Sequence, residues 1–268
     1  MSLRIATLNV NGIRSSDRRG LTDWLAAREC DLVALQEVRC PPERMPALPG
    51  YVTYDSGTFA GRNGVALLSA TAPSAVRTFG GLQFDHEGRY LEADFELHGR
   101  RLTVVSLYVP KGGRANEPDF ERRHAHKRRF LASLSGRLTR ARRTAGREGR
   151  EFLVLGDLNI AHTPLDLTHA RSNRNQVGFL DSERAWLGGL LGPRRLVDVV
   201  RHLHPGTQGP YSWWPWNAAN LAADVGWRID YHLATPGLAR SAVTAGTDRP
   251  PSYEQRLSDH APVVVDYA

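Results

Sequence analysis

Short apolar or alternating runs recur along the chain, and each is bounded by Gly, Pro, Asn or Asp. Runs of this length and setting predict buried or half-buried strands. The pattern occurs in nine segments: residues 3–10, 32–36, 65–69, 89–97, 101–108, 152–156, 211–214, 228–234 and 261–267. The short link His98-Gly99-Arg100 between two of them predicts an antiparallel hairpin.

Apolar residues at helical spacing predict helices between these strands. One helix follows Asp17, and another covers residues 182–191. A third carries an apolar stripe made of Phe130, Leu131, Leu134 and Leu138. A hairpin combined with strand–helix alternation favours packed mixed sheets covered by helices over a purely parallel sheet. No change in composition marks a linker, so we expect one domain over residues 1–268.

The composition is that of a globular protein. Of 268 residues, 41% are hydrophobic and 24% charged, which excludes disordered, collagen-like and membrane classes. No apolar run approaches the ~20 residues that a bilayer-spanning helix needs, and the chain begins directly with a predicted strand, so we expect a cytoplasmic protein. With only Cys30 and Cys40, a disulfide framework and a Cys-based zinc site are both disfavoured.

The net charge of +7 is concentrated in one segment. Residues 121–150 hold eleven basic and two acidic side chains, whereas the remainder holds 24 basic and 26 acidic ones. Because the apolar stripe lies within this segment, it reads as an amphipathic helix whose exposed side is either a solvated face or a surface that tracks DNA. Residues 140–150 read as an exposed loop without an assigned role.

Polar side chains cap the predicted strands at five places. Asn and Asp are common turn formers, but five such sites on different strands are harder to explain as turns. Asp230 is the least turn-like, because it lies in an aliphatic and aromatic run where a buried carboxylate requires a cation or a histidine. The residues are Asn9 with Asn11, Glu37, Asp157 with Asn159, Asp230, and Asp259 with His260.

Together these groups match the needs of metal-assisted phosphodiester hydrolysis. Oxygen ligands without cysteine favour Mg²⁺, with Mn²⁺ as the alternative, over zinc. A carboxylate must deprotonate the attacking water, and cationic or hydrogen-bonding groups must stabilise the charge that develops on phosphorus.

Six motifs resemble, in order, those of the exonuclease III family of abasic-site endonucleases, within the endonuclease/exonuclease/phosphatase superfamily. They extend over nearly the whole chain, and the Gly-Trp-Arg-Ile-Asp-Tyr motif is the most specific to the DNA-repair branch. The motifs are Leu8-Asn9-Val10-Asn11-Gly12-Ile13-Arg14, Leu35-Gln36-Glu37, Tyr108-Val109-Pro110, Gly156-Asp157-Leu158-Asn159, Gly226-Trp227-Arg228-Ile229-Asp230-Tyr231 and Ser258-Asp259-His260.

The resemblance implies an α/β four-layer sandwich, with two packed mixed β-sheets flanked by helices. It also implies roles for the residues in the matching motifs. The catalytic residues would be Tyr108, Asp157, Asn159, Asp230 and His260. The metal site would draw on Asn9, Glu37, Asp157, Asn159, Asp259 and His260, with Glu37 as the principal ligand.

Substrate binding is implied for a further set of residues. Trp213, Trp227 and Ile229 would form an apolar pocket that admits a flipped-out baseless sugar and excludes a normal nucleotide. DNA contacts are expected from Asn11, Lys127, Asn173 and Arg174. The chain departs from the family pattern at Pro215-Trp216-Asn217 and at Lys111, which bears on substrate preference more than on chemistry.

The leading interpretation is a Mg²⁺-dependent DNA-repair phosphodiesterase similar to exodeoxyribonuclease III. It would incise duplex DNA 5′ to abasic sites, with 3′→5′ exonuclease and 3′-phosphodiesterase activities alongside. The expected partner is duplex DNA with abasic or 3′-blocked sites, the expected state is a monomer, and no membrane is involved. The alternatives are a less selective nuclease or phosphatase of the superfamily and a non-catalytic DNA-binding module.

Overall fold

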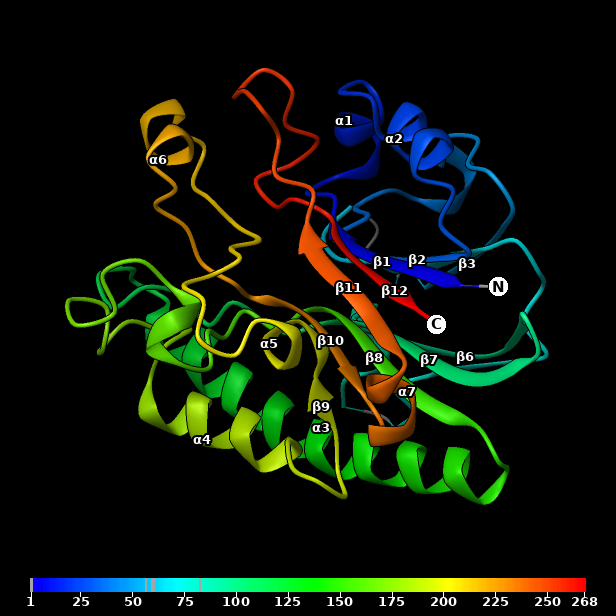
Figure 1. Ribbon diagram of the computed structural model, residues 1–268. Coiled ribbons are helices and arrows are strands. Elements are labelled where there is room, and N and C mark those ends of the chain that lie inside the picture. The colour runs from blue at the N-terminus through cyan, green and yellow to red at the C-terminus, as the bar shows by residue number, and fades with distance from the viewer. Residues whose placement is uncertain (1, 56, 59–60, 82) are drawn as a thin grey trace.

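The computed structural model describes residues 2–55, 57–58, 61–81 and 83–268, which form two six-stranded sheets packed face to face (Figure 1). The strands of the first sheet are, in spatial order, β11 (Ala242–Thr247), β12 (Val263–Tyr267), β1 (Leu3–Asn9), β2 (Leu32–Gln36), β4 (Val65–Ser69) and β3 (Tyr51–Asp55). Those of the second are β5 (Ala75–Thr78), β6 (Tyr90–Leu97), β7 (Arg100–Tyr108), β8 (Glu151–Asp157), β10 (Asp230–Ala234) and β9 (Val197–Asp198).

Each sheet is mixed and apolar on both faces. The pairs β1–β2 and β7–β8 are parallel, and the other neighbours are antiparallel. On β1, Ile5 packs into the core between the sheets, whereas Ala6 and Leu8 pack into the cluster outside the first sheet. Strands covered on both sides need apolar residues at successive positions, which explains their continuous hydrophobic runs.

Helices cover the two outer faces. Leu21 and Leu25 of α2 (Leu21–Arg28) pack against the first sheet, and α3 (Phe120–Arg147) and α4 (Asp181–Leu190) pack against the second (Figure 1). The predicted four-layer sandwich is therefore confirmed. The shorter helices are α1 (Ile13–Asp17), α5 (Val199–Leu203), α6 (Ala218–Ala222) and α7 (Pro236–Arg240), with 3-10 turns at Pro42–Arg44, Asp85–Glu87 and Pro164–Asp166.

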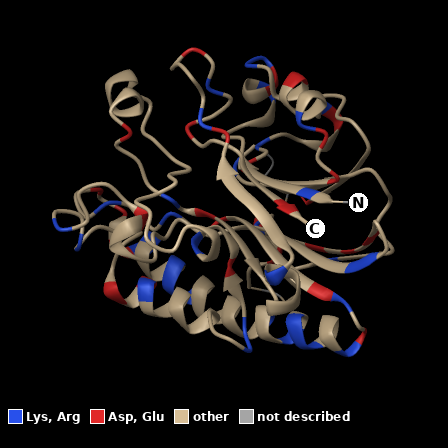
Figure 2. Ribbon diagram, viewed as in Figure 1, with Lys and Arg blue, Asp and Glu red and all other residues tan. Residues whose placement is uncertain are grey.

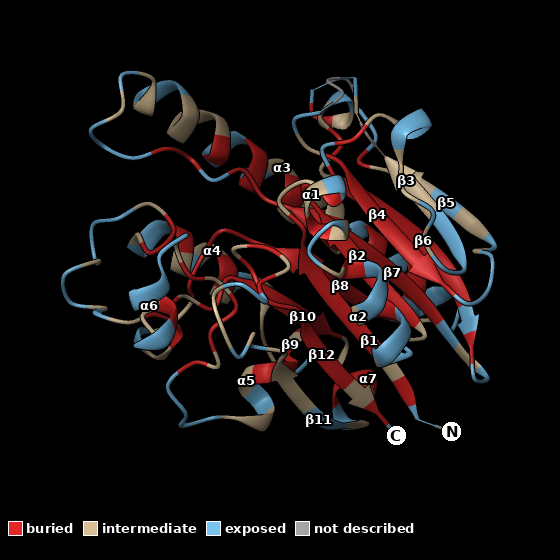
Figure 3. Ribbon diagram, turned by 90° about the horizontal axis from the view of Figure 1, so that it is seen from above, coloured by how far each residue is buried: buried red, intermediate tan, exposed pale blue. Residues whose placement is uncertain are grey.

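Five strands bring polar side chains to one edge of the sandwich. The parallel pairs end at Asn9 and Gln36 in the first sheet and at Tyr108 and Asp157 in the second. The antiparallel strand β10 begins at this edge, because Asp230 pairs directly with Asp157 in the ladder. In the view from above, the central strands that carry these residues are buried (Figure 3). Rigid, buried strands thus hold the polar groups in place.

Several predicted strands differ from those observed. Residues 211–214 do not form a strand, since Trp213 makes only isolated bridges to Trp227 and His260. Their apolar character comes from loop packing instead, with Tyr211 and Trp214 buried in a separate cluster. The strands β3, β5, β9 and β11 were not predicted.

The helix α3 is longer than expected. The prediction of a loop at residues 140–150 is wrong, because Ala141 and Ala145 extend the buried apolar stripe and the helix continues to Arg147. The helix connects the end of β7 to the start of β8, and these two strands are parallel. It therefore begins near the edge that carries the polar groups and runs toward the opposite edge of the sheet.

Candidate active site

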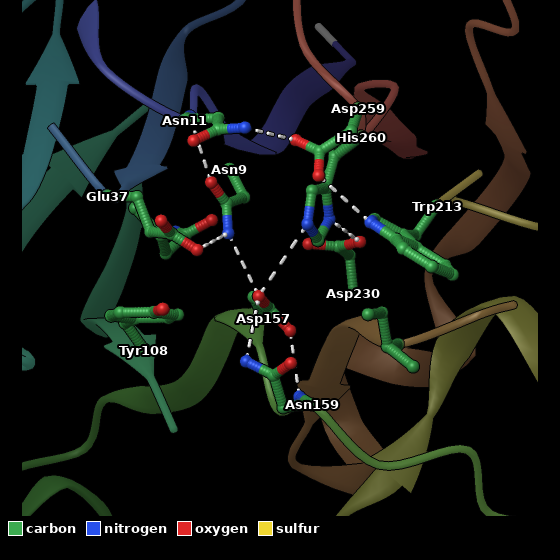
Figure 4. A network of polar contacts seen from close by, with 12 residues as sticks. Asn9, Asn11, Glu37, Tyr108, Asp157, Asn159, Trp213, Asp230, Asp259 and His260 are labelled. Carbon is green, nitrogen blue, oxygen red and sulfur yellow. Dashed lines mark hydrogen bonds and ion pairs between the residues drawn. The ribbon is translucent and has the colours of Figure 1, made fainter. Parts of the chain in front are cut away.

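Asp157 lies at the centre of the polar groups and is 1% exposed. It accepts hydrogen bonds from Asn9 Nδ2 (2.9 Å), the backbone N–H of Asn159 (2.7 Å) and Asn159 Nδ2 (3.1 Å) (Figure 4). Burial raises the pKa of Asp157, the His260 charge opposes this, and the nearby carboxylates add to it, giving a pKa of about 7. Asp157 can therefore exchange a proton near neutral pH.

The turn that carries Asp157 depends on its neighbours. Gly156 has a φ of +134°, and a Cβ there would collide with the carbonyl oxygen of Leu107. Only glycine fits this backbone. Asn159 has a φ of +49°, a left-handed conformation that is strained for a residue with a side chain, and its Nδ2 also donates to Val109 O (3.0 Å).

Asp230 and His260 form a buried pair. His260 Nδ1 lies 2.8 Å from Asp230 Oδ2, which also accepts from Ser212 Oγ (2.6 Å). This contact confirms the prediction that Asp230 requires a histidine or a cation. Burial lowers the pKa of His260, but the charges of Asp230, Asp157 and Asp259 outweigh it and raise the pKa to about 10. The imidazole is thus a cation, with Nε2 at 3.8 Å from Asp157 Oδ2.

Glu37 contributes a carboxylate from the first sheet. It follows β2, has a φ of +51°, and accepts a hydrogen bond from Asn9 Nδ2 on Oε1 (2.8 Å). Its other oxygen pairs with the half-exposed guanidinium of Arg39. Because Asn9 Nδ2 donates to Asp157 as well, the Asn9 amide links the carboxylates of the two sheets.

Asp259 is fixed by two donors from different segments. Asn11 Nδ2 donates to Oδ1 (2.8 Å), and Trp213 Nε1 donates to Oδ2 (3.1 Å) (Figure 4). Burial raises the pKa of Asp259, but the His260 charge and these hydrogen bonds lower it overall. Asp259 therefore stays ionised and holds Asn11 and Trp213 together.

Tyr108 closes the site on the side of β7. Burial raises the pKa of Tyr108 well above its usual value, and the charge of Glu37 raises it further. The Arg89 guanidinium lies over the ring, 4.6 Å from its centroid. Tyr108 is thus a neutral phenol packed beside the carboxylates.

These side chains surround an open cavity of about 830 Å³. Trp213, Trp227 and Ile229 form an apolar wall, backed by Phe179 and Leu167. The lining of the cavity is also basic, with side chains from Arg39, Lys111, Arg114 and Arg123. Lys111, one of the departures from the family pattern, places its ammonium 5.6 Å from the Trp213 ring centroid.

The structure brings most, but not all, of the predicted site residues together. Asn173 lines the cavity, whereas Arg174 is exposed and lies outside the lining. Lys127 contradicts its predicted DNA contact, because it is fully buried. Its ammonium pairs with Glu183 (2.6 Å) and donates to the carbonyl of Asn159 (2.9 Å), so it cannot reach solvent.

Sequence reasoning missed Arg256, which organises the loops behind the site. It is 1% exposed, and its guanidinium donates to the backbone carbonyls of Trp214 (2.6 Å), Pro215 (2.8 Å), Ser258 (3.0 Å) and Asp259 (2.8 Å). A single side chain therefore joins the Trp213 wall to the Asp259–His260 segment. Its local sequence gives no signal of this, because two of the four partners, Trp214 and Pro215, are distant in the chain.

The donor set fits a metal ion. Asp157, Asp230 and His260 place ligand atoms within 4.8 Å of one another. Asp230 and His260 already bind each other, however, so the free oxygen donors lie on the side of Glu37 and Asp157. Carboxylate and amide oxygens without a thiol suit a hard divalent cation.

The cavity thus combines a buried carboxylate whose pKa is about 7 with a cationic histidine, and this fold and site are those of a phosphodiester hydrolase of the nuclease type. The chain belongs to the Endonuclease/Exonuclease/phosphatase family, whose model matches residues 6–260. Curated relatives and solved structures agree with the predicted resemblance to exonuclease III.

The chain is 28% identical to the exodeoxyribonuclease of Bacillus subtilis (strain 168), over 97% of this chain and 98% of that one. It is 30% identical to recombination repair protein 1 of Drosophila melanogaster, over 98% of this chain but only 37% of that longer protein. Among solved structures, the AP endonuclease from Archaeoglobus fulgidus superposes with a TM-score of 0.82 at 28% identity, covering 99% of both chains. Within the described residues, every helix is too short or too polar to span a bilayer.

Proposed function

We propose that this chain is a metal-dependent DNA-repair nuclease that cuts duplex DNA on the 5′ side of abasic sites. The observation that carries the proposal is one cavity in which the polar groups around Asp157 face the apolar wall of Trp213, Trp227 and Ile229. Hydrolysis needs the polar side, and recognition of a baseless sugar needs the apolar one.

Asp157 is the base of the proposed reaction. Its ionised form accepts a proton from water, whose oxygen attacks the phosphorus. The bond from phosphorus to the 3′ oxygen of the preceding nucleotide breaks, and this oxygen takes up a proton from solvent water. The products are a 3′-hydroxyl on the upstream strand and a 5′-phosphate on the abasic residue. The hydrogen bonds from Asn159 and Asn9 keep the Asp157 carboxylate in position.

Other groups stabilise the phosphate. The imidazolium of His260, which Asp230 keeps charged and oriented, donates from Nε2 to a phosphate oxygen. Asn159 Nδ2 and the Tyr108 hydroxyl supply further donors at the same cavity.

Glu37 is the principal residue proposed to hold the metal, with Asn9 and Asp259 beside it. Mg²⁺ suits these oxygen donors, with Mn²⁺ as the alternative, and when bound it would neutralise phosphate charge and lower the pKa of a nearby water. Arg39 forms an ion pair with Glu37, and binding of the cation would displace the Arg39 guanidinium from this carboxylate.

The apolar wall is proposed to select the substrate. A baseless deoxyribose fits against Trp213, Trp227 and Ile229, whereas a base on the same sugar would collide with the wall. Asn11, Asn173 and Arg174 are proposed to contact the DNA around this pocket, which is near the basic rim of the cavity.

The test uses a duplex with one tetrahydrofuran abasic analogue, the same duplex undamaged, and a soluble phosphoinositide, each with Mg²⁺ or EDTA. Nicking confined to the lesion and abolished by EDTA is expected. Asp157→Asn should bind the duplex normally but turn over roughly 10³-fold or more slowly.

Each alternative has its own signature in this experiment. Equal cutting of the undamaged duplex would replace the proposal with a less selective nuclease, and release of phosphate from the phosphoinositide would favour a phosphatase. Binding without product would indicate a DNA-binding module. A 3′-blocked duplex in the same assay measures the 3′-phosphodiesterase and exonuclease activities.

A further inference from the structure

A stripe of arginines runs along the exposed side of α3. Arg129, Arg140, Arg143 and Arg147 are all exposed. At 100° and 1.5 Å per residue, they fall within an arc of about 60° and extend over about 27 Å of the helix. We call these four residues the arginine stripe. Figure 2 shows basic bands and no acidic ones along the distal half of this helix.

The arginine stripe has no acidic partner among the described residues. Some other basic residues of α3 are neutralised: Arg123 pairs with Glu117 (2.6 Å), and Arg137 pairs with Glu92 (2.9 Å). None of the four stripe residues forms such an ion pair within the described part of the chain, and the only acidic residue inside α3 is Glu121, in its first turn. The positive charge of the stripe is therefore available to a ligand.

A second cavity lies at the distal end of the stripe. It has a volume of about 320 Å³ and lies between α3 and the segment after α4. Arg142, Arg143 and Arg195 line it above an apolar floor. Arg142 Nη1 donates to the carbonyl of Arg194 (3.1 Å), and Arg195 donates to that of Gly189. Backbone oxygens thus orient two guanidinium groups whose other N–H groups have no hydrogen-bond partner among the described residues.

This surface is separate from the catalytic cavity. Because α3 starts at the catalytic edge of β7 and ends where β8 begins, its distal half lies toward the opposite edge of the second sheet. None of the stripe residues lines the catalytic cavity. A phosphate held at the stripe is thus not the phosphate that is cut.

We propose that the arginine stripe, together with Arg142 and Arg195, binds the backbone of a second segment of duplex DNA while the catalytic cavity holds the first. The choice of DNA as the ligand rests on the proposed function. The guanidinium fork matches phosphate oxygens, and a linear array of about 27 Å spans about eight base pairs. Holding two segments lets the enzyme pass from one to the other.

The arginine stripe itself carries no large exposed hydrophobic side chain, which argues against a protein or a membrane as its ligand. Protein interfaces have apolar, charge-depleted centres, and membrane-binding helices bury an apolar face. Among the described residues, the large exposed hydrophobic side chains lie outside α3, and they are Tyr51, Val52, Val76, Trp216 and Val243. An exposed row of arginines without large hydrophobic side chains fits a nucleic acid backbone best.

The experiment measures how many undamaged duplexes of about 12 base pairs bind one chain at low salt, by native mass spectrometry. Wild-type protein should bind two, and R143E/R147E should bind one. The control R44E/R240E has the same change in charge at two exposed arginines outside α3, and it should still bind two. One duplex on the wild type, or two on R143E/R147E, would overturn the proposal. The proposal would also be overturned if polyglutamate displaced the second duplex at a lower concentration than competitor DNA does. That result would indicate that the surface binds an acidic protein.

Incision of a short abasic duplex by the same proteins tests the proposed function separately from binding at the second site. R143E/R147E should keep kcat/KM within about twofold of wild type, which also shows that it folds. If neither the wild type nor the variants incise the lesion, the proposed function is wrong. The number of duplexes bound per chain still tests the second DNA-binding site in that case. A large loss of kcat/KM in R143E/R147E alone would show that the stripe serves the first segment and would overturn its independence.

Discussion

His260 Nδ1 and Asp230 Oδ2 lie 2.8 Å apart in a region where both side chains are almost completely buried. Burial alone would make the imidazole neutral, and the Asp230 charge reverses this by raising the pKa of His260. The charged state of one residue therefore depends on the other.

Asp230→Asn should lower the pKa of His260. Because the cationic form exists below the pKa, the alkaline limb of the pH–rate profile should move to lower pH, and turnover at pH 8 should fall by roughly 10²-fold. The profile of kcat/KM on an abasic duplex measures this. An unchanged alkaline limb with lower activity would show that Asp230 only orients the ring.

Lys127→Met should destabilise the protein by about 3–5 kcal/mol, because it leaves Glu183 buried without its cation. The double variant Lys127→Met with Glu183→Leu should recover much of this loss, since it removes both charges. Urea denaturation gives the free energies of unfolding. The control Lys111→Met, at the exposed cavity rim, should leave stability unchanged and raise KM for DNA. Equal stability of the single and double variants would contradict the predicted pairing energy.

Arg256→Met should remove the donors of four backbone carbonyls at once. Unsatisfied buried acceptors cost about 1–3 kcal/mol each, so we expect a loss of stability of about 3 kcal/mol or more. Because two of the carbonyls flank the Trp213 wall and one belongs to Asp259, kcat should fall as well, and Arg256→Lys should restore part of both. The control is Arg249→Met, a more exposed arginine nearby. If kcat is normal in Arg256→Met at a temperature where it is folded, Arg256 only stabilises the fold.

His232 should make the protein sensitive to acid. Burial lowers its pKa from near 6.5 to about 3, and its Nε2 donates to the carbonyl of Val263 (3.2 Å). Between these pH values the unfolded chain binds a proton that the folded chain does not, so stability falls as pH decreases, by at most about 1.4 kcal/mol per unit. His232→Gln keeps a donor for Val263 and should flatten this decline in urea titrations from pH 7 to pH 5. Equal slopes for the two proteins would refute the assignment.

The sequence predicted the central strands because both of their faces are covered, so their hydrophobic runs are continuous. The strands β3, β5 and β11 were missed because each has one bonded neighbour only and exposes Tyr51, Val76 or Val243. Their pattern of polar and apolar residues resembles that of a loop.

The site was predicted where its residues follow strands or lie within them, as Asp157 and Asp230 do. Arg256 and Glu183 were missed because each has a partner in a distant segment, Trp214 for Arg256 and Lys127 for Glu183. The burial of Lys127 did have a signal, since it lies three and four residues before Phe130 and Leu131 on the helix, but its charge suggested an exposed position.

The last strand, β12, lies between β11 and β1, so it pairs with the first strand of the chain. Asp259 and His260 directly precede this strand. During synthesis on the ribosome, β1 emerges early but lacks its neighbour β12, and Asp157 and His260 cannot yet meet. The cavity therefore stays incomplete until the segment after residue 258, which supplies Asp259 and His260, has emerged and inserted. The order in which the chain is made delays assembly of the cavity until the fold is complete.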